Sequence, residues 1–167
     1  MKLRKTEEKD LIQIMEIIKS AQGYLKENGV DQWQDGYPSS QDIKSDIIKG
    51  DSYVLVKDDQ VIGTAYIAFE EEQDYNNIYD GEWLTLKTYA VIHRIAVSDK
   101  ERGGAAASKI IKEVTKMCCD KGVESIKIDT HRDNLTMQRF LKKMGFHYCG
   151  IIYLRDGSER FAYERVV

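Results

Sequence analysis

Proline, cysteine and long apolar runs are scarce in this chain of 167 residues, and each scarcity excludes a class of protein. With Pro38 as the one proline, no proline-rich linker divides the sequence. The three cysteines are an odd number and Cys118 and Cys119 are adjacent, which is a poor basis for a disulfide framework and indicates a reducing compartment. No apolar run approaches the roughly 18 residues that a membrane-spanning helix needs.

An excess of charge of one sign is also missing, since 25 Lys and Arg stand against 28 Asp and Glu, for a net charge of −3. No run rich in Lys and Arg marks a site for nucleic acid or an anionic membrane, so we expect neither as a partner. Cysteines and histidines lack the paired spacing of metal ligands, which predicts no metal site. The first ten residues are charged where a secretion signal needs an apolar stretch, which predicts a cytoplasmic protein.

The pattern of apolar residues predicts one globular domain over residues 1–167 with a mixed α/β (α+β) fold, in the order βααβββαβαββ. Helical spacing and capping residues predict helices over 7–28, from Ser39 or Ser40 to Gly50, from the 102–107 segment to Gly122, and over 134–144. Alternating and β-branched runs predict strands over 2–5, 53–56, 61–69, 83–97, 124–129, 146–153 and 159–166, with 70–82 as an exposed loop. We therefore expect a central, mostly antiparallel sheet of about seven strands with one parallel crossover.

The most informative segment is residues 92–108, in which a predicted strand leads through a polar turn into a helix that begins with small residues. Small side chains let a ligand approach the backbone, and the free N–H groups at the start of a helix favour phosphate oxygens. The segment lacks the Gly-Lys-Ser/Thr of a P-loop and the glycine spacing of the dinucleotide fingerprint. The alternative is that Ala105, Ala106 and Ala107 serve only close packing of the helix on the sheet.

This segment resembles the acyl-CoA signature of the GNAT superfamily of N-acetyltransferases, Arg/Gln-x-x-Gly-x-Gly/Ala after a strand that ends in hydrophobic-x-Val. The matching residues are Arg102-Gly103-Gly104-Ala105-Ala106-Ala107 after Ile95-Ala96-Val97, with Ala105 in place of the usual middle glycine. About thirty residues later, the segment from Asn134 to Phe146 resembles the family's Asn-(x)n-Tyr-x-Lys-x-Gly-Phe pattern. Two motifs in the right order are more specific than either one alone, and the predicted topology agrees with this family.

The resemblance implies a GNAT-like fold and an N-acetyltransferase that moves the acetyl group of acetyl-CoA to a primary amine of a small molecule or peptide. Transfer is direct, in a ternary complex and without metal. By the resemblance, the backbone of Ile95, Ala96 and Val97 holds the pantetheine arm, and the remaining acetyl-CoA contacts come from Arg102, Gly103, Gly104, Ala105, Ala106, Ala107, Ser108 and Asn134. Many members carry a tyrosine on the last helix that protonates the leaving thiolate, but the matching residue here is Leu141, which falls on an apolar stripe.

The residues for proton transfer must therefore come from elsewhere. His93, two residues before Ile95, is the first candidate base, and the alternative is a histidine hydrogen-bonded within the sheet. His131 follows Asp129 at the end of the predicted 124–129 strand, where the carboxylate can orient the imidazole or bind the acceptor. The alternative is that Asp129 or Asp133 only caps the next helix. Tyr153 is a candidate acid, with packing on the sheet as the alternative.

Trp33 and Tyr37 lie between the first two predicted helices, a region that covers the acceptor pocket in the resembling family. They are candidates for its apolar wall, or else they pack the helices together. A silent acyl-CoA-binding sensor or regulatory module, or a binder of nucleotide phosphate, fits the same motif. The sequence also leaves open a homodimer formed through a sheet edge or the C-terminal strands.

Overall fold

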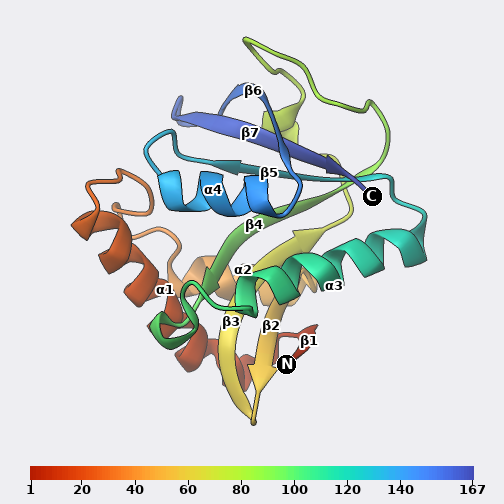
Figure 1. Ribbon diagram of the computed structural model, residues 1–167. Coiled ribbons are helices and arrows are strands. Elements are labelled where there is room, and N and C mark those ends of the chain that lie inside the picture. The colour runs from red at the N-terminus through yellow and green to blue at the C-terminus, as the bar shows by residue number, and fades with distance from the viewer. The chain divides into compact units, whose positions relative to one another are not determined.

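A computed structural model describes all residues from 1 to 167 and contains one mixed sheet of seven strands in the order β1-β2-β3-β4-β5-β7-β6 (Figure 1). The strands are β1 (Lys2–Lys5), β2 (Ser52–Lys57), β3 (Gln60–Ala68), β4 (Tyr89–Val97), β5 (Ser125–Thr130), β6 (His147–Tyr153) and β7 (Glu159–Val166). The helices are α1 (Leu11–Glu27), α2 (Ser40–Lys49), α3 (Ala106–Lys121) and α4 (Leu135–Lys143). Strands β4 and β5 pair in parallel, whereas β1–β2, β2–β3, β5–β7 and β6–β7 are antiparallel. The predicted fold class is confirmed.

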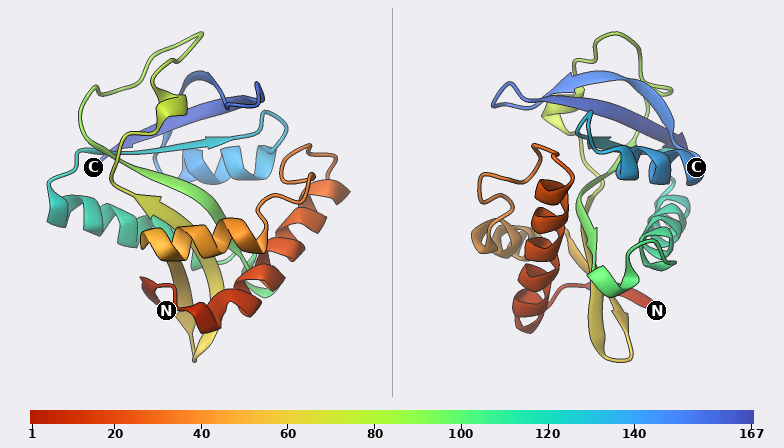
Figure 2. Two further views of the ribbon diagram at one scale, coloured as in Figure 1. Left: turned by 180° about the vertical axis from the view of Figure 1, so that it is seen from behind. Right: turned by 60° about the vertical axis from the view of Figure 1, so that its left-hand side comes forward.

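By its internal contacts the chain divides into two compact units, the first of residues 1–67 and 93–113 and the second of residues 68–92 and 114–167. In the first unit, α1 and α2 lie on one face of β2 and β3, and the first turns of α3 lie on the other (Figure 2). Its core is an aliphatic cluster from the two helices and the strands: Ile14, Ile17, Ile18, Ile43, Val54, Val61 and Ala96. Burial of this cluster is what holds the amphipathic helices on the sheet.

The ends of the helices in the first unit follow from capping. At α2 the predicted start and stop are confirmed, because the Ser39 hydroxyl accepts the Asp42 N–H and Gly50 takes the left-handed conformation at the C-cap. The predicted start of the first helix at residue 7 is wrong. A capping box between Glu7 and Asp10 instead closes a short 3-10 turn, and α1 begins after it at Leu11.

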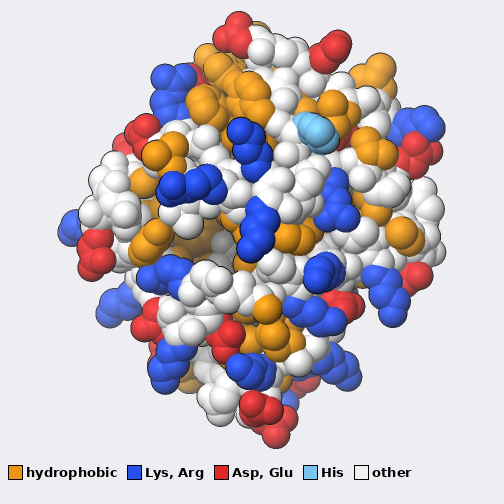
Figure 3. Space-filling view, viewed as in Figure 1, with side chains coloured by type: hydrophobic (Ala, Val, Ile, Leu, Met, Phe, Trp, Pro, Cys, Tyr) orange, Lys and Arg blue, Asp and Glu red, His pale blue; other side chains and the backbone are white.

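In the second unit, α4 lies on one face of β5 and β7, and the long connection from β3 to β4 lies on the opposite face (Figures 1 and 2). Leu141 of α4 is fully buried. The exposed side of α4 carries Arg139, Lys142 and Lys143, and Figure 3 shows blue side chains gathered over this helix. Basic residues in the last turn favour the negative end of the helix dipole.

The predicted strand over 83–97 is wrong in its first part, because β4 begins at Tyr89 and residues 83–88 belong to the connection. The backbone N–H groups of Leu84 and Thr85 donate to the Glu164 carboxylate at 2.6 and 3.3 Å instead of to a neighbouring strand. The Trp83 ring covers the ammonium of Lys127 at 4.3 Å. The alternating pattern of residues 83–88 is typical of a strand, but hydrogen bonds to the buried Glu164 carboxylate hold the segment as a loop.

The outer side of β6 carries a segment of the same connection. Tyr79 and Ile151 form an antiparallel bridge with N–H to carbonyl distances of 2.8 Å in both directions. The backbones approach so closely that a Cβ on Gly81 would lie 1.9 Å from the Cys149 carbonyl oxygen, and one on Gly150 would lie 2.6 Å from the Tyr79 carbonyl oxygen. Only glycine fits these two positions. No helix of the protein has the length and apolar content that crossing a membrane requires.

Candidate active site

The first unit presents an open cradle of backbone N–H groups between β4 and α3. Residues Gly103 to Ala105 are exposed, and Gly103 turns the chain with a φ of 76°. The N–H groups of the first α3 residues have no helical acceptor, and those of Gly103 and Ala105 have no acceptor either. This geometry suits a group with several anionic oxygens.

Ala105, which stands where the family pattern has glycine, does not take a positive φ. Its methyl group therefore causes no backbone strain, and the left-handed position of the loop is Gly103 instead. The turn before the loop is held by an ion pair of 3.1 Å between Lys57 and Glu101. The loop thus has a defined shape with alanine at position 105.

Arg102 extends from this loop onto α1. Its guanidinium carbon lies 4.3 Å from the centre of the Tyr24 ring, and Nη2 donates to the Ser20 hydroxyl at 3.4 Å. A cation–π contact of this kind holds the side chain while leaving other N–H groups of the guanidinium for an anion. Sequence reasoning identified Arg102 but missed Ser20 and Tyr24, whose one signal is that they lie four residues apart on a helix.

Arg94 is the most constrained residue of β4. It takes a φ of 52° inside a strand, a conformation that side chains with a Cβ seldom adopt and that redirects the side chain as a β-bulge does. Its guanidinium donates from Nε and Nη2 to Asp46 at 2.8 and 2.7 Å, and from Nη1 to the Tyr37 hydroxyl at 2.5 Å. It also lies 4.9 Å from the centre of the Tyr66 ring. Sequence reasoning missed both Arg94 and Asp46.

Electrostatics tie this cluster together. Burial raises the pKa of Asp46 and of Tyr37, and the Arg94 guanidinium opposes both changes. The pKa of Arg94 is raised overall. Burial acts to lower it, but the interactions with Tyr37 and Asp46 together outweigh burial. Arg94 therefore stays charged, opposes the effect of burial on Asp46 and holds the Tyr37 phenol in place.

Of the other sequence candidates in this unit, His93 lies near this cluster and Trp33 lies against the core. The His93 ring stacks on Tyr66, with ring centres 5.7 Å apart and an angle of 29°. Trp33 is half-buried against the aliphatic core cluster, whereas Tyr37 keeps 41% of its surface exposed. Of the two aromatic candidates for an acceptor wall, Trp33 serves the core and Tyr37 presents a polar atom.

In the second unit, the end of β5 carries the other candidates. Asp129 accepts a hydrogen bond of 2.7 Å from the hydroxyl of the buried Tyr75. Burial, followed by the Asp129 charge, raises the pKa of Tyr75 well above its usual value. The neighbouring Thr130 hydroxyl is buried without a hydrogen-bond partner. Tyr75 was missed because it lies in the acidic loop, where nothing marks it as buried.

His131 uses its Nδ1 atom to accept the N–H of Asp133 at 3.0 Å. The lone pair that a general base needs is therefore engaged at Nδ1. The helix that follows is capped by Asn134, whose side chain accepts the Met137 N–H at 3.1 Å. The proposed capping by Asp129 or Asp133 is thus wrong.

The residues considered for acid catalysis on α4 and β6 also have defined surroundings. Leu141 is fully buried, so the family's tyrosine position is core in this protein. Tyr153 is 46% exposed and meets the Tyr79 ring edge-on at 5.4 Å. The alternative that Tyr153 is a surface aromatic of the sheet agrees with this contact.

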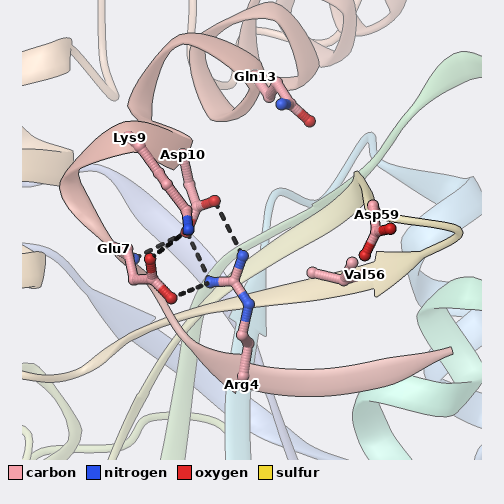
Figure 4. Close-up of a pocket in the computed structure, with 7 residues that line it drawn as sticks. All are labelled: Arg4, Glu7, Lys9, Asp10, Gln13, Val56 and Asp59. Carbon is pink, nitrogen blue, oxygen red and sulfur yellow. Dashed lines mark hydrogen bonds and ion pairs between the residues drawn. The ribbon is translucent and has the colours of Figure 1, made fainter.

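A polar pocket elsewhere in the first unit is lined by Arg4, Glu7, Lys9, Asp10, Gln13, Val56 and Asp59 (Figure 4). Its central charges are paired with one another, since Arg4 meets Asp10 at 2.7 Å and Lys9 meets Glu7 at 2.7 Å. Hydrogen bonding and charge pairing lower the pKa of Asp10 accordingly. No group of three or more His, Cys, Asp or Glu side chains in the protein is placed to hold a metal ion.

A mixed sheet with a free N–H cradle between β4 and α3 defines an acyl-CoA-dependent transferase of the GNAT class. The family model for the Acetyltransferase (GNAT) family matches residues 14–146, and the chain belongs to this family. No curated protein gave a match.

Solved structures agree over nearly the whole chain. A GNAT-family acetyltransferase from Streptococcus agalactiae is 34% identical with a TM-score of 0.88, over 99% of this chain and 95% of that one. A structure from Staphylococcus aureus, described as a putative acetyltransferase, is 24% identical with a TM-score of 0.74, over 99% of both chains. A paia N-acetyltransferase from Thermoplasma acidophilum in complex with coenzyme A is 18% identical with a TM-score of 0.70, over 99% of this chain and 98% of that one. The protein is an acetyltransferase of this family.

Proposed function

We propose that the protein transfers the acetyl group of acetyl-CoA to a primary amine of a small molecule or peptide, directly and in a ternary complex. The observation that carries the proposal is the cradle of free N–H groups at Gly103 and Ala105 to Ser108, which is exposed at Gly103 and Ala105 and directly follows Arg102 in the chain. The segment that resembles the family's acyl-CoA signature covers the same residues, and they lie within the range that the family model matches. The alternative that the alanines only pack the helix does not explain an exposed Ala105.

The residues of the first unit suit acetyl-CoA. The N–H groups of Gly103 and of Ala105 to Ser108, together with the Arg102 guanidinium, match the oxygens and charge of a pyrophosphate. The backbone of Ile95, Ala96 and Val97 at the end of β4 is the segment we assign to the pantetheine arm. For Asn134, in the second unit, the assignment rests on the family resemblance alone, and its side chain caps α4. When bound, acetyl-CoA supplies a thioester that an amine can attack.

His93 is the residue we assign to the amine. It is half-buried on β4, two residues before Ile95, and its stacking on Tyr66 fixes the plane of the imidazole. In this position it takes the proton that the amine loses. In the second unit, Asp129 stays a candidate for binding the acceptor by its sequence position alone, and Tyr75 fixes its carboxylate.

The first test is thermal unfolding of the protein with and without acetyl-CoA, with ATP and NAD as controls. Ligand at a hundred times its Kd adds about 2.7 kcal/mol to the free energy of unfolding. For a chain of this size the melting temperature then rises by roughly 5–10 °C. A rise with acetyl-CoA alone supports the proposal. No rise at millimolar acetyl-CoA, or an equal rise with ATP, contradicts it.

The second test separates an enzyme from a silent acyl-CoA-binding module, which the buried Leu141 at the family's tyrosine position also fits. Release of free CoA thiol is followed with a panel of small primary amines and peptides. Turnover that His93→Ala abolishes and His147→Ala leaves unchanged supports the enzyme, since His147 lies exposed on β6. Binding of acetyl-CoA without turnover on any acceptor supports the module.

A further inference from the structure

The hydroxyl group of Tyr37 is prepared for proton donation by its neighbours. Its oxygen accepts a hydrogen bond from Arg94 Nη1, and its own hydrogen has no acceptor in the protein. An oxygen that accepts from a guanidinium carries excess negative charge more easily, which is what a phenol needs when it gives up its proton. The arrangement thus leaves one hydrogen to give and one cation to stabilise the phenolate.

The phenol is also fixed in direction. Arg94 is held on its other side by two hydrogen bonds to Asp46, which is only 4% exposed. The Tyr37 carbonyl accepts from Gln22 of α1 at 3.0 Å, which fixes the backbone that carries the ring. With 41% of the residue exposed, the hydroxyl remains accessible to a bound molecule.

The residue that binds this phenol is adjacent in sequence to the segment proposed for the thioester arm. Arg94 directly precedes the Ile95 to Val97 segment assigned above to the pantetheine arm, and its positive φ turns its side chain out of the regular alternation of the strand. All these residues belong to the first unit, as does the Arg102 loop.

We propose that Tyr37, held by Arg94 and Asp46, is the proton donor to the leaving thiolate and supplies the acid that the family's α4 tyrosine supplies elsewhere. This inference rests on the proposed acetyl-CoA function. As the amine nitrogen forms its bond to the acyl carbon and the C–S bond breaks, Tyr37 gives its phenolic proton to the sulfur. His93 takes the proton that the amine loses and releases it to solvent, and the phenolate takes one proton from solvent. In sum, amine and thioester become amide and thiol.

The test needs no acceptor, because a donor to the thiolate also acts on bound coenzyme A. The pKa of the bound thiol is read from the ultraviolet absorbance of the thiolate, with desulfo-coenzyme A as the blank. A hydrogen bond to a charged group contributes about 1.5–3 kcal/mol, so Tyr37→Phe raises the pKa of the bound thiol by about 1 to 2. The charged groups that act on Tyr37 are Arg94 of β4 and Asp42 and Asp46 of α2, and they are unchanged in this variant.

The matched control is Tyr53→Phe, since Tyr53 lies in the first unit on β2 with its ring under the Lys5 ammonium at 4.2 Å. The control leaves the thiol pKa unchanged. Melting temperatures of both variants are recorded first, and Tyr37→Leu serves as a second variant that removes the same hydroxyl. With any acceptor that the screen finds, Tyr37→Phe lowers kcat by about 10²-fold or more with an unchanged KM for acetyl-CoA.

The outcomes separate the two proposals. If the unmodified protein does not bind coenzyme A, the proposed function fails. If coenzyme A binds equally to all variants and the thiol pKa is the same with Tyr37 and with Phe or Leu in its place, the role of Tyr37 is refuted while the function stands. A rise of the thiol pKa in both position-37 variants, and not in Tyr53→Phe, supports the inference.

Discussion

The buried charges of Lys127 and Glu164 provide a test of what holds the second unit together. The two residues are 4% and 0% exposed and stand opposite each other in the pairing of β5 with β7. The Lys127 ammonium lies between the rings of Trp83 and Tyr89, at 4.3 and 4.1 Å. The Glu164 carboxylate accepts the Leu84 N–H at 2.6 Å. Each charge therefore depends on the other and on the connection before β4.

The perturbation is Glu164→Gln, which keeps the volume and removes the charge. Removing one partner of a buried charge pair leaves the other uncompensated and costs about 3–5 kcal/mol of unfolding free energy. With a shift of about 2–4 °C for each kcal/mol, the melting temperature falls by roughly 6–20 °C. Denaturant unfolding gives the free energy directly, and an unchanged dependence on denaturant shows that the folded state is intact.

The double-mutant cycle adds Lys127→Met, which keeps an apolar stem of similar length between the two rings. This change leaves the Glu164 charge buried, so it destabilises too, but the variant with both changes loses less than the sum of the two. Additive losses, or a Glu164→Gln loss below about 0.5 kcal/mol, would refute the reasoning.

The pH dependence gives an independent measurement of the same pair. Burial lowers the pKa of Lys127 below its usual 10.5, and the Glu164 charge opposes this. The unfolded chain binds more protons than the folded protein between the lowered value and 10.5, so stability rises with pH across that interval. In Lys127→Met this rise is absent.

Three further predictions concern the site, the core and the thiols. Arg102→Glu puts a negative charge where we place the pyrophosphate and weakens binding of coenzyme A in calorimetry; unchanged affinity contradicts the assigned loop. Leu141→Tyr restores the family residue at a fully buried position, so it lowers stability by about 1–3 kcal/mol without raising turnover, and a gain in turnover contradicts our account of the acid. In a thiol-titration assay only the exposed Cys119 reacts quickly in the native protein, because burial raises the pKa of Cys118 and of Cys149 to about 11; fast reaction of two or three thiols contradicts this.

The fold followed from the sequence where its causes are local. The capping of α2 by Ser39 and Gly50 is visible in a few neighbouring residues, and the structure confirms it. The start of β4 did not follow, because Leu84 donates to a carboxylate 80 residues away in the sequence. Leu86, which alternation placed in a strand, is 98% exposed. The periodicity of a segment carries no information about a side chain that is distant in the sequence and binds the backbone of that segment.

In the candidate site, too, the features with local causes were predicted and those that depend on contacts distant in the sequence were not. The cradle from Arg102 to Ser108 is one continuous motif, and sequence reasoning identified it together with its family. The contacts around Arg94 join residues 48 and 57 positions apart, and they depend on a left-handed residue inside a strand that no propensity favours. Such strain is found where function requires a particular side-chain direction, and rules drawn from regular structure fail there.

The bridge between Tyr79 and Ile151 has a consequence for assembly. A sheet recruits a second molecule most simply by accepting another strand along an unpaired edge. On β6 that place is taken by the chain's own Tyr79, and Gly81 and Gly150 let it lie against the strand. A dimer that extends the sheet from β6 must first displace this segment. Copies of the protein that associate at this end therefore do so through side chains rather than through shared backbone hydrogen bonds.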